Sequence, residues 1–126
     1  MGVTYDTGAL VAAERDDREM WLIHRSYVDA AVLPIVPAPV LAEAWRGDGR
    51  QALLSRLLRG CVVEEMTEAQ AKDVGALAGR AKRSDIVDVT VVEGAVRRGD
   101  TIITSDRDDL AAIASASAAR PWIVDI

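Results

Sequence analysis

The most telling stretch of the chain is TIITSDRDDL, residues 101–110, in which a short apolar run leads directly into closely spaced aspartates. The first four of these residues predict a strand, and Arg107 opens a short predicted helix to Ala114. The start of the chain repeats this arrangement, because the apolar residues 3–5 end at Asp6 and turn into a second predicted helix. Both stretches therefore predict a buried strand that passes through an acidic turn into a helix.

The rest of the chain continues this alternation of strands and helices. Further strands are predicted at 32–36, 61–63 and 122–124, and further helices at 17–31, from Pro39, at 53–58, 67–82 and 84–98. Thr67 with Gln70 forms the pattern of a capping box, and Ser84 is a candidate N-cap. No tight hairpin signal separates the strands. The sequence predicts one domain over residues 1–126: a three-layer α/β/α sandwich with a mostly parallel sheet of about four to five strands.

The composition favours an aliphatic core. Hydrophobic residues make up 50% of the 126 residues, but aromatic residues only 4%, and phenylalanine is absent. The single cysteine, Cys61, excludes an internal disulfide and is interpreted as a small core residue in a strand. The single histidine, His24, falls in a separate helix and offers no base for a thiol nucleophile. No apolar stretch reaches the roughly 18 residues of a membrane helix, so a cytoplasmic protein without membrane contact is predicted.

The charge gives a mixed indication about nucleic acid. A net charge of −5 argues against general affinity for a polyanion. However, several acids fall where a cation would neutralise them, and 13 of the 15 basic residues are arginine, the exceptions being Lys72 and Lys82. Arginine is the side chain best suited to bidentate phosphate contacts.

Acidic residues from four separate elements are predicted to meet at one edge of the sheet. Asp6 and Asp106 follow strands, and ligands of such sheets bind outside the carboxyl ends of the strands. Glu43 lies among apolar residues of a predicted helix, where an unpartnered carboxylate would be costly. Asp85 and Asp88 share one helix face, and Asp88 is the more enclosed. Carboxylates collected in this way repel one another unless a hard cation such as Mg²⁺ or Mn²⁺ binds, which indicates phosphodiester chemistry.

Each acid also has an ordinary structural explanation. Asp106, Asp108 and Asp109 are typical of a helix start, and Asp6 of a turn. Asp85 in a first helical turn favours the helix dipole. The placement of all of them at one end of the sheet is what favours a common site.

Four stretches, taken together, resemble the successive motifs of PIN domains. They are YDTGAL at 5–10, PAPVLAE at 37–43, SDIVD at 84–88 and ITSDRDDL at 103–110. The likeness is greatest to the VapC-type toxin ribonucleases of bacterial toxin–antitoxin pairs. The resemblance implies an acidic quartet of Asp6, Glu43, Asp88 and Asp106, with Asp85 as an additional acid. The serine common in the family two residues after the first aspartate is Gly8 here.

The resemblance also implies an activity and partners. The implied activity is that of an endoribonuclease that uses one or two Mg²⁺ or Mn²⁺ ions held by the quartet. The implied partners are RNA, a VapB-type antitoxin and a second copy of the chain. The candidates for RNA contact are Arg46, Arg83, Thr104, Ser105 and Arg107, of which Thr104 and Ser105 could instead orient Asp106. An antitoxin groove could use Trp21, Tyr27, Trp45 and the leucines of the 53–58 helix, although those leucines also suit a core.

Two other interpretations of the sequence compete with this one. A response-regulator receiver would need an aspartate after the third strand and a lysine after a late strand, but Glu64 and Glu65 follow the third strand and neither lysine follows a strand. A PIN-like binding protein with little catalysis, acting through its partner, stays open. So do the RNA target, the number of metals, and metal ligation by Asp85 or Asp108.

Overall fold

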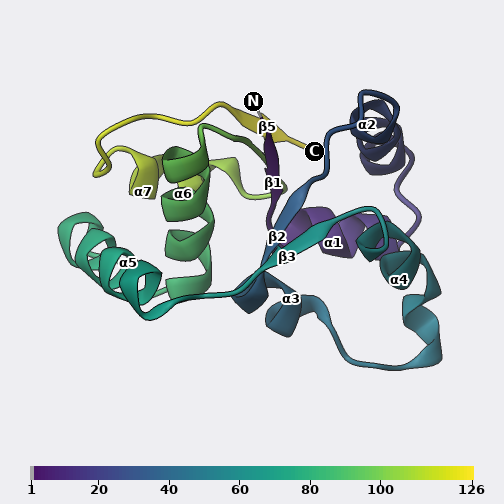
Figure 1. Ribbon diagram of the computed structural model, residues 1–126, viewed down its shortest axis with the longest axis horizontal. Helices are drawn as coiled ribbons and strands as arrows, with labels where there is room; N and C mark the ends of the chain where they lie inside the picture. The colour runs from purple at the N-terminus through teal and green to yellow at the C-terminus, as the bar shows by residue number, and fades with distance from the viewer. Residues whose placement is uncertain (1) are drawn as a thin grey trace.

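The computed structural model describes residues 2–126, which form a five-stranded sheet in the order β3-β2-β1-β4-β5 (Figure 1). Every neighbouring pair of strands is parallel, so the prediction of a mostly parallel sheet is confirmed. Thr4, in the central strand, pairs with Ile35 on one side and Ile102 on the other. The strands are β1 (Val3–Tyr5), β2 (Ile35–Pro37), β3 (Val62–Glu64), β4 (Thr101–Thr104) and β5 (Ile123–Asp125).

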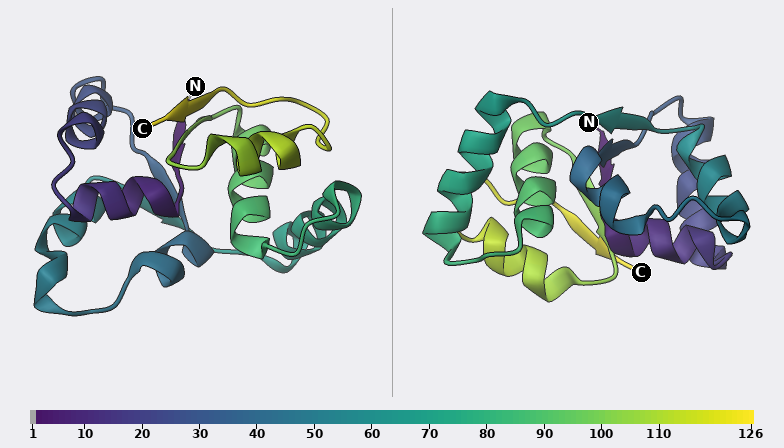
Figure 2. Two further views of the ribbon diagram at one scale, coloured as in Figure 1. Left: turned by 180° about the vertical axis from the view of Figure 1, so that it is seen from behind. Right: turned by 90° about the horizontal axis from the view of Figure 1, so that it is seen from below.

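Helices cover both faces of this sheet, as the three-layer prediction requires (Figures 1 and 2). The chain moves outward from β1 to β3 and then returns to β4 and β5, and right-handed crossovers place the helices of the two directions on opposite faces. One layer holds α1 (Thr7–Glu14), α2 (Arg18–Asp29), α3 (Ala38–Ala44), the 3₁₀ turn η1 (Gly49–Gln51) and α4 (Ala52–Leu58). The other holds α5 (Glu68–Ala81), α6 (Ile86–Arg98) and α7 (Arg107–Ala114).

The core is aliphatic, as the composition predicts. Tyr5 is the one aromatic side chain of the buried hydrophobic core within residues 2–126. Fully buried side chains include Val3 of β1, Ile102 of β4 and Leu110 of α7. Strands covered by helices on both faces carry continuous apolar runs, which is why β1 and β4 are easy to recognise in the sequence.

Some predicted boundaries were wrong for local reasons. β2 begins at Ile35 rather than Val32, because the Val32 amide donates to the Tyr27 carbonyl (2.9 Å) in the C-terminal turn of α2. β3 and β5 each lie one residue later than predicted. The N-cap of α6 is Asp85 and not Ser84.

The capping box predicted at the start of α5 is only half formed. Thr67 is the N-cap and its hydroxyl accepts a hydrogen bond from the Gln70 amide at 3.1 Å. The Gln70 side chain does not return to Thr67; it donates to Glu93 of α6 at 2.9 Å. The glutamine therefore joins two helices instead of closing the cap.

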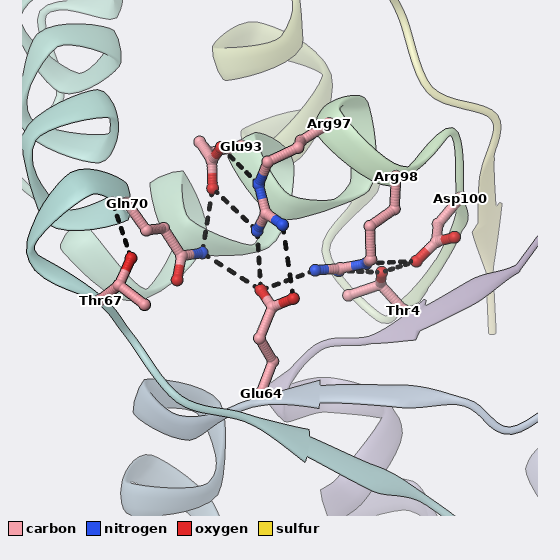
Figure 3. A network of polar contacts seen from close by, with 8 residues as sticks. All are labelled: Thr4, Glu64, Thr67, Gln70, Glu93, Arg97, Arg98 and Asp100. Atoms are coloured by element: carbon pink, nitrogen blue, oxygen red, sulfur yellow. Dashed lines mark hydrogen bonds and ion pairs between the residues drawn. The ribbon is translucent and has the colours of Figure 1, made fainter.

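A polar network ties the C-terminal end of α6 to the sheet (Figure 3). Glu64 accepts hydrogen bonds from Arg97 and Arg98, each at 2.7 Å. Arg98 also donates to Asp100 (2.8 Å) and to Thr4 (2.9 Å). Burial by itself would raise the pKa of Glu64, but the two guanidinium groups outweigh it and the pKa is lowered. The network fixes the position of α6, whose other end carries Asp88. Among residues 2–126, no helix is both long and apolar enough to cross a bilayer.

Candidate functional site

The candidate site lies where the direction of the sheet connections reverses. β1 and β4 are neighbours, and their successors β2 and β5 lie on opposite sides of them. Asp6 follows β1 directly, and its amide donates to the Ile103 carbonyl of β4 at 3.2 Å. Asp106 lies two residues beyond the end of β4. The two aspartates therefore stand at a topological switch point, the usual ligand site of open α/β sheets.

Asp6 is held in one orientation by its hydrogen bonds. Its side chain is 4% exposed, and Oδ1 accepts from the Ala9 amide at 3.2 Å as the N-cap of α1. Oδ2 accepts from the Thr104 hydroxyl at 2.5 Å. Burial raises the pKa of Asp6, with a smaller contribution from the charge of Asp106, although the hydrogen bonds act in the opposite direction. Asp6 is thus a rigid carboxylate whose negative charge is costly without a cation.

Thr104 connects the two strand-end acids. Its hydroxyl donates to Asp6 and accepts from the Asp106 amide at 2.8 Å. The side chain is fully buried, so it has no surface to offer to a phosphate. This arrangement favours the orienting role of Thr104 over direct contact with a phosphate.

Three carboxylates come within metal-binding reach of one another. Oxygen atoms of Asp88, Asp106 and Asp109 lie within 4.8 Å of each other. Asp88 comes from the first turn of α6 and Asp109 from the first turn of α7. The pKa of Asp88 is raised to about 7, first by burial and then by the negative charges of Asp85 and Asp6, with the two other acids adding to them. This repulsion is what a bound divalent cation would relieve.

Asp109 belongs to this group of three, although the sequence predicts it only as part of the acidic cluster around Asp106 and not as a metal ligand. It stands three residues after Asp106, a spacing that places two side chains on one helix face. The same spacing was used for Asp85 and Asp88, and it could have identified Asp109 as well. Asp108, whose metal ligation the sequence leaves open, is not in the group of three.

Asp85 lies at the edge of the site with its side chain already engaged. It is the N-cap of α6, and its Oδ1 accepts from the amides of Val87 (3.1 Å) and Asp88 (3.3 Å). Its charge acts on Asp88 by raising the pKa of that carboxyl. Asp88 is partly buried and Asp85 exposed, as predicted.

Glu43 differs from its prediction in one respect. We expected an enclosed carboxylate on an apolar helix face, but the side chain is exposed, because α3 is short and ends one residue later at Ala44. Its Oε1 accepts from the hydroxyl of Thr7, the residue after Asp6, at 2.6 Å. Glu43 is therefore placed beside the start of α1 and lies outside the group of three acids.

The other candidates for RNA contact are all exposed. Arg46 donates to the Trp45 carbonyl at 2.8 Å at the end of α3. Arg83 lies 3.7 Å from Asp109, and Arg107 donates to the Ile123 carbonyl at 3.1 Å.

Ser105 explains why residue 8 is glycine. A Cβ on Gly8 would lie 2.0 Å from the Ser105 hydroxyl oxygen and 2.9 Å from its backbone nitrogen. The space that a serine side chain would need at position 8 is therefore filled from the neighbouring strand end.

An amphipathic groove lies apart from the acidic site. It measures about 850 Å³ between α2 and α4, and Trp21 and Leu53 contribute to its lining. Trp45 lines a different cavity, with Leu41 and Leu58. Leu54 and Leu57 are fully buried, so their alternative as core residues is confirmed.

Neither the single histidine nor the single cysteine is available as a base or a nucleophile. His24 is buried, with Nδ1 hydrogen-bonded to the Tyr5 hydroxyl at 2.9 Å, and burial lowers its pKa. Burial raises the pKa of the Cys61 thiol to about 12. The chemistry of this site therefore rests on carboxylates. An all-oxygen group of acids matches the preference of Mg²⁺ and Mn²⁺, so the residues present fit the implied metal.

Comparison with known proteins agrees with this architecture. A family model described as PIN domain matches residues 3–116. The fold is similar to that of PAE2754 from Pyrobaculum aerophilum, with a TM-score of 0.64 and 17% identity, covering 95% of this chain and 87% of that one. No curated protein sequence matches the chain.

Two further similar structures are complexes with DNA. VapBC2 from Rickettsia felis, bound to a promoter DNA fragment, gives a TM-score of 0.72 at 12% identity and covers 100% of this chain and 99% of that one. FitAB bound to an IR36 DNA fragment gives a TM-score of 0.66 at 14% identity and covers 98% of this chain and 94% of that one.

Proposed function

The chain belongs to the PIN domain family, and on that premise we propose that it is a metal-dependent endoribonuclease of the toxin class. The observation that carries the proposal is the meeting of Asp88, Asp106 and Asp109 within 4.8 Å, beside Asp6, at the carboxyl ends of β1 and β4. Asp106 follows a strand, and Asp88 and Asp109 lie in the first turns of two helices. Burial of apolar surface does not require these charged side chains to lie together. Residues 1–126 would act as one nuclease domain, since all five strands belong to one sheet.

Asp6, Asp88 and Asp106 would hold one or two Mg²⁺ or Mn²⁺ ions, with Glu43 and Asp109 completing the oxygen donors. When bound, such a cation lowers the pKa of a coordinated water and stabilises charge on the attacked phosphate. Thr104 keeps Asp6 and the Asp106 backbone in register, so the strand-end acids are preorganised. Glu43 is exposed, so its carboxylate would be accessible to a cation, and its Oε1 accepts from the Thr7 hydroxyl beside Asp6.

The proposed partners follow from the similar structures and from the surface. Two of these structures are VapBC2 and FitAB. We expect a VapB-type antitoxin to bind this chain, and the groove between α2 and α4 is its candidate seat. The same proposal includes a homodimer of this chain that acts on RNA in the cytoplasm.

The test is cleavage by purified, antitoxin-free protein. Total RNA is incubated with the protein in Mg²⁺, in Mn²⁺ and in EDTA, and the cleavage ends are mapped. We expect discrete products that disappear in EDTA and with Asp6→Asn or Asp106→Asn. The matched control is Asp73→Asn, which removes an exposed carboxylate of α5 and should cleave like the wild type.

Two results would contradict the proposal. Equal products from the wild type and from both site variants would assign the cleavage to a contaminant. Absence of cleavage by every antitoxin-free protein, together with tight binding of the antitoxin in a separate binding assay, would favour the alternative of a PIN-like binding protein that acts through its partner.

A further inference from the structure

A second groove, of about 210 Å³, lies between α7 and the segment that leads into β5. Figure 1 shows this segment passing α7 on its way to the edge of the sheet. Ala111 and Ala114 of α7 line the groove together with Trp122. The Trp122 side chain is 76% exposed, more than any other large hydrophobic side chain among residues 2–126. An indole in this position has no role in the core.

The charge of this groove is opposite to that of the whole protein. Its lining contains Arg107 and Arg120 and no acidic residue, although the chain carries a net charge of −5. Neither guanidinium forms an ion pair with a carboxylate within residues 2–126. The larger groove between α2 and α4 differs, because Asp16 and Asp29 line it together with arginines.

One residue links the groove to the acidic site. Arg107 directly follows Asp106 and reaches the Ile123 carbonyl at 3.1 Å, so one residue borders both. The Ile102 amide donates to the Trp122 carbonyl at 2.8 Å, which places Trp122 beside the middle of β4. At about 3.3 Å per extended residue, the backbone path from Ile102 to Asp106 is at most about 13 Å, a span of a few nucleotides.

From these observations we infer that the groove is a substrate subsite, in which a base of single-stranded RNA stacks on Trp122 while Arg107 and Arg120 hold the adjoining phosphates. This inference rests on the proposed function and extends it to a particular surface. An exposed aromatic ring beside arginines is the usual platform for single strands, and stacking tolerates any base. The subsite therefore binds and orients the RNA strand, while cleavage occurs at the acidic residues.

The inference is tested by RNA binding in the Asp88→Asn background, which should not cleave because it lacks one of the proposed metal ligands. A fluorescein-labelled, mixed-sequence single-stranded oligoribonucleotide is titrated with Asp88→Asn protein in Mg²⁺, and fluorescence anisotropy gives Kd. Adding Trp122→Ala should raise Kd roughly 5- to 150-fold, the usual effect of losing one stacked base. Trp122→Phe should restore most of the affinity. Adding Arg120→Ala should reduce the slope of log K against log salt by about 0.7.

Matched controls are Leu33→Ala and Arg59→Ala, which remove an exposed apolar and an exposed basic side chain outside the groove. Both should leave Kd unchanged. Circular dichroism and thermal melting verify folding. If Trp122→Ala does not fold, Arg120→Ala decides, and an unchanged salt slope with Arg120→Ala overturns the inference.

The outcomes separate this inference from the proposed function. An unchanged Kd with Trp122→Ala overturns the subsite, even if the wild type cleaves RNA. If Kd depends on Trp122 but the wild type does not cleave RNA, the subsite is supported and the proposed nuclease activity is contradicted. β5 is an edge strand, so light scattering is measured as well. A change of oligomeric state with Trp122→Ala and no change of RNA affinity would assign this face to protein contacts and overturn the inference.

Discussion

Replacing Asp88 by asparagine should stabilise the metal-free protein. Asp88 is partly buried, and the charges of Asp85 and Asp6 act on it in addition to its burial. Asparagine has nearly the same shape but no charge, so it removes the repulsion without creating a cavity. The gain should appear in EDTA and should be reversed when a divalent cation is present, because the cation needs the carboxylate.

The magnitude follows from the pKa of Asp88, which is about 7 in the folded protein against an ordinary value of 3.8. A difference of about 3 pH units corresponds to about 4 kcal/mol at full strength. Because the side chain is partly open to solvent, we halve this value to about 2 kcal/mol. A raised carboxyl pKa means that the folded state binds more protons, so stability is lost as the pH rises from 3.8 through 7.

Urea unfolding of the wild type and of Asp88→Asn, in EDTA at about pH 8 and about pH 4.5, measures the effect. The difference of about 2 kcal/mol in favour of the variant should be largest at pH 8 and should shrink at pH 4.5. In Mg²⁺ at about 100 times Kd, the wild type should gain about 2.7 kcal/mol and the variant much less. Equal stability of the two proteins at pH 8 in EDTA would refute the reasoning, because neither burial nor repulsion would then penalise the charged carboxylate of Asp88.

Three further changes test the surroundings of the site. Thr104→Val should cost about 1–2 kcal/mol of unfolding free energy and most of the RNA cleavage, because Asp6 loses its buried donor; urea melts and cleavage assays measure both. Gly8→Ala should lower the melting temperature and the activity, because the new methyl group would meet Ser105 at 2.0 Å. Burial lowers the pKa of His24 below its ordinary value of 6.5, so protons bind preferentially to the unfolded chain. The wild type should therefore lose stability relative to His24→Gln as the pH falls below 6.5, and thermal melts across that pH range measure the difference.

Matched controls make these three results interpretable. Thr90→Val removes another buried hydroxyl, which bonds the Ile86 carbonyl at 2.7 Å, and should lower stability with little loss of cleavage. Gly75→Ala adds a methyl group to α5 where nothing lies within 4 Å, and should stabilise by up to about 1 kcal/mol. If Thr90→Val loses as much activity as Thr104→Val, the positioning role of Thr104 is contradicted. Full activity of Gly8→Ala would contradict the predicted clash with Ser105. Equal pH profiles of stability for His24→Gln and the wild type would contradict the prediction for His24.

The layout of the sheet and two site acids could be read from local sequence patterns. Apolar runs buried on both sides identify β1 and β4, and Asp6 and Asp106 stand at their ends. Parallel strands place their carboxyl ends at one edge, so these two acids had to be near one another once the strands were neighbours. Asp88 was predicted as the more enclosed of two helix acids for the same local reason, since apolar residues follow it.

The remaining features required the tertiary arrangement. The group formed by Asp109 with Asp88 depends on how α6 and α7 are rotated against each other, and the exposure of Glu43 depends on where α3 ends. The groove around Trp122 joins two segments whose contact no periodicity records. Sequence patterns report which face of one element is buried, because burial follows from spacing along that element. Which side chains of different elements meet is set by the packing of the whole chain, and that packing alone brought these acids, and this indole with its arginines, together.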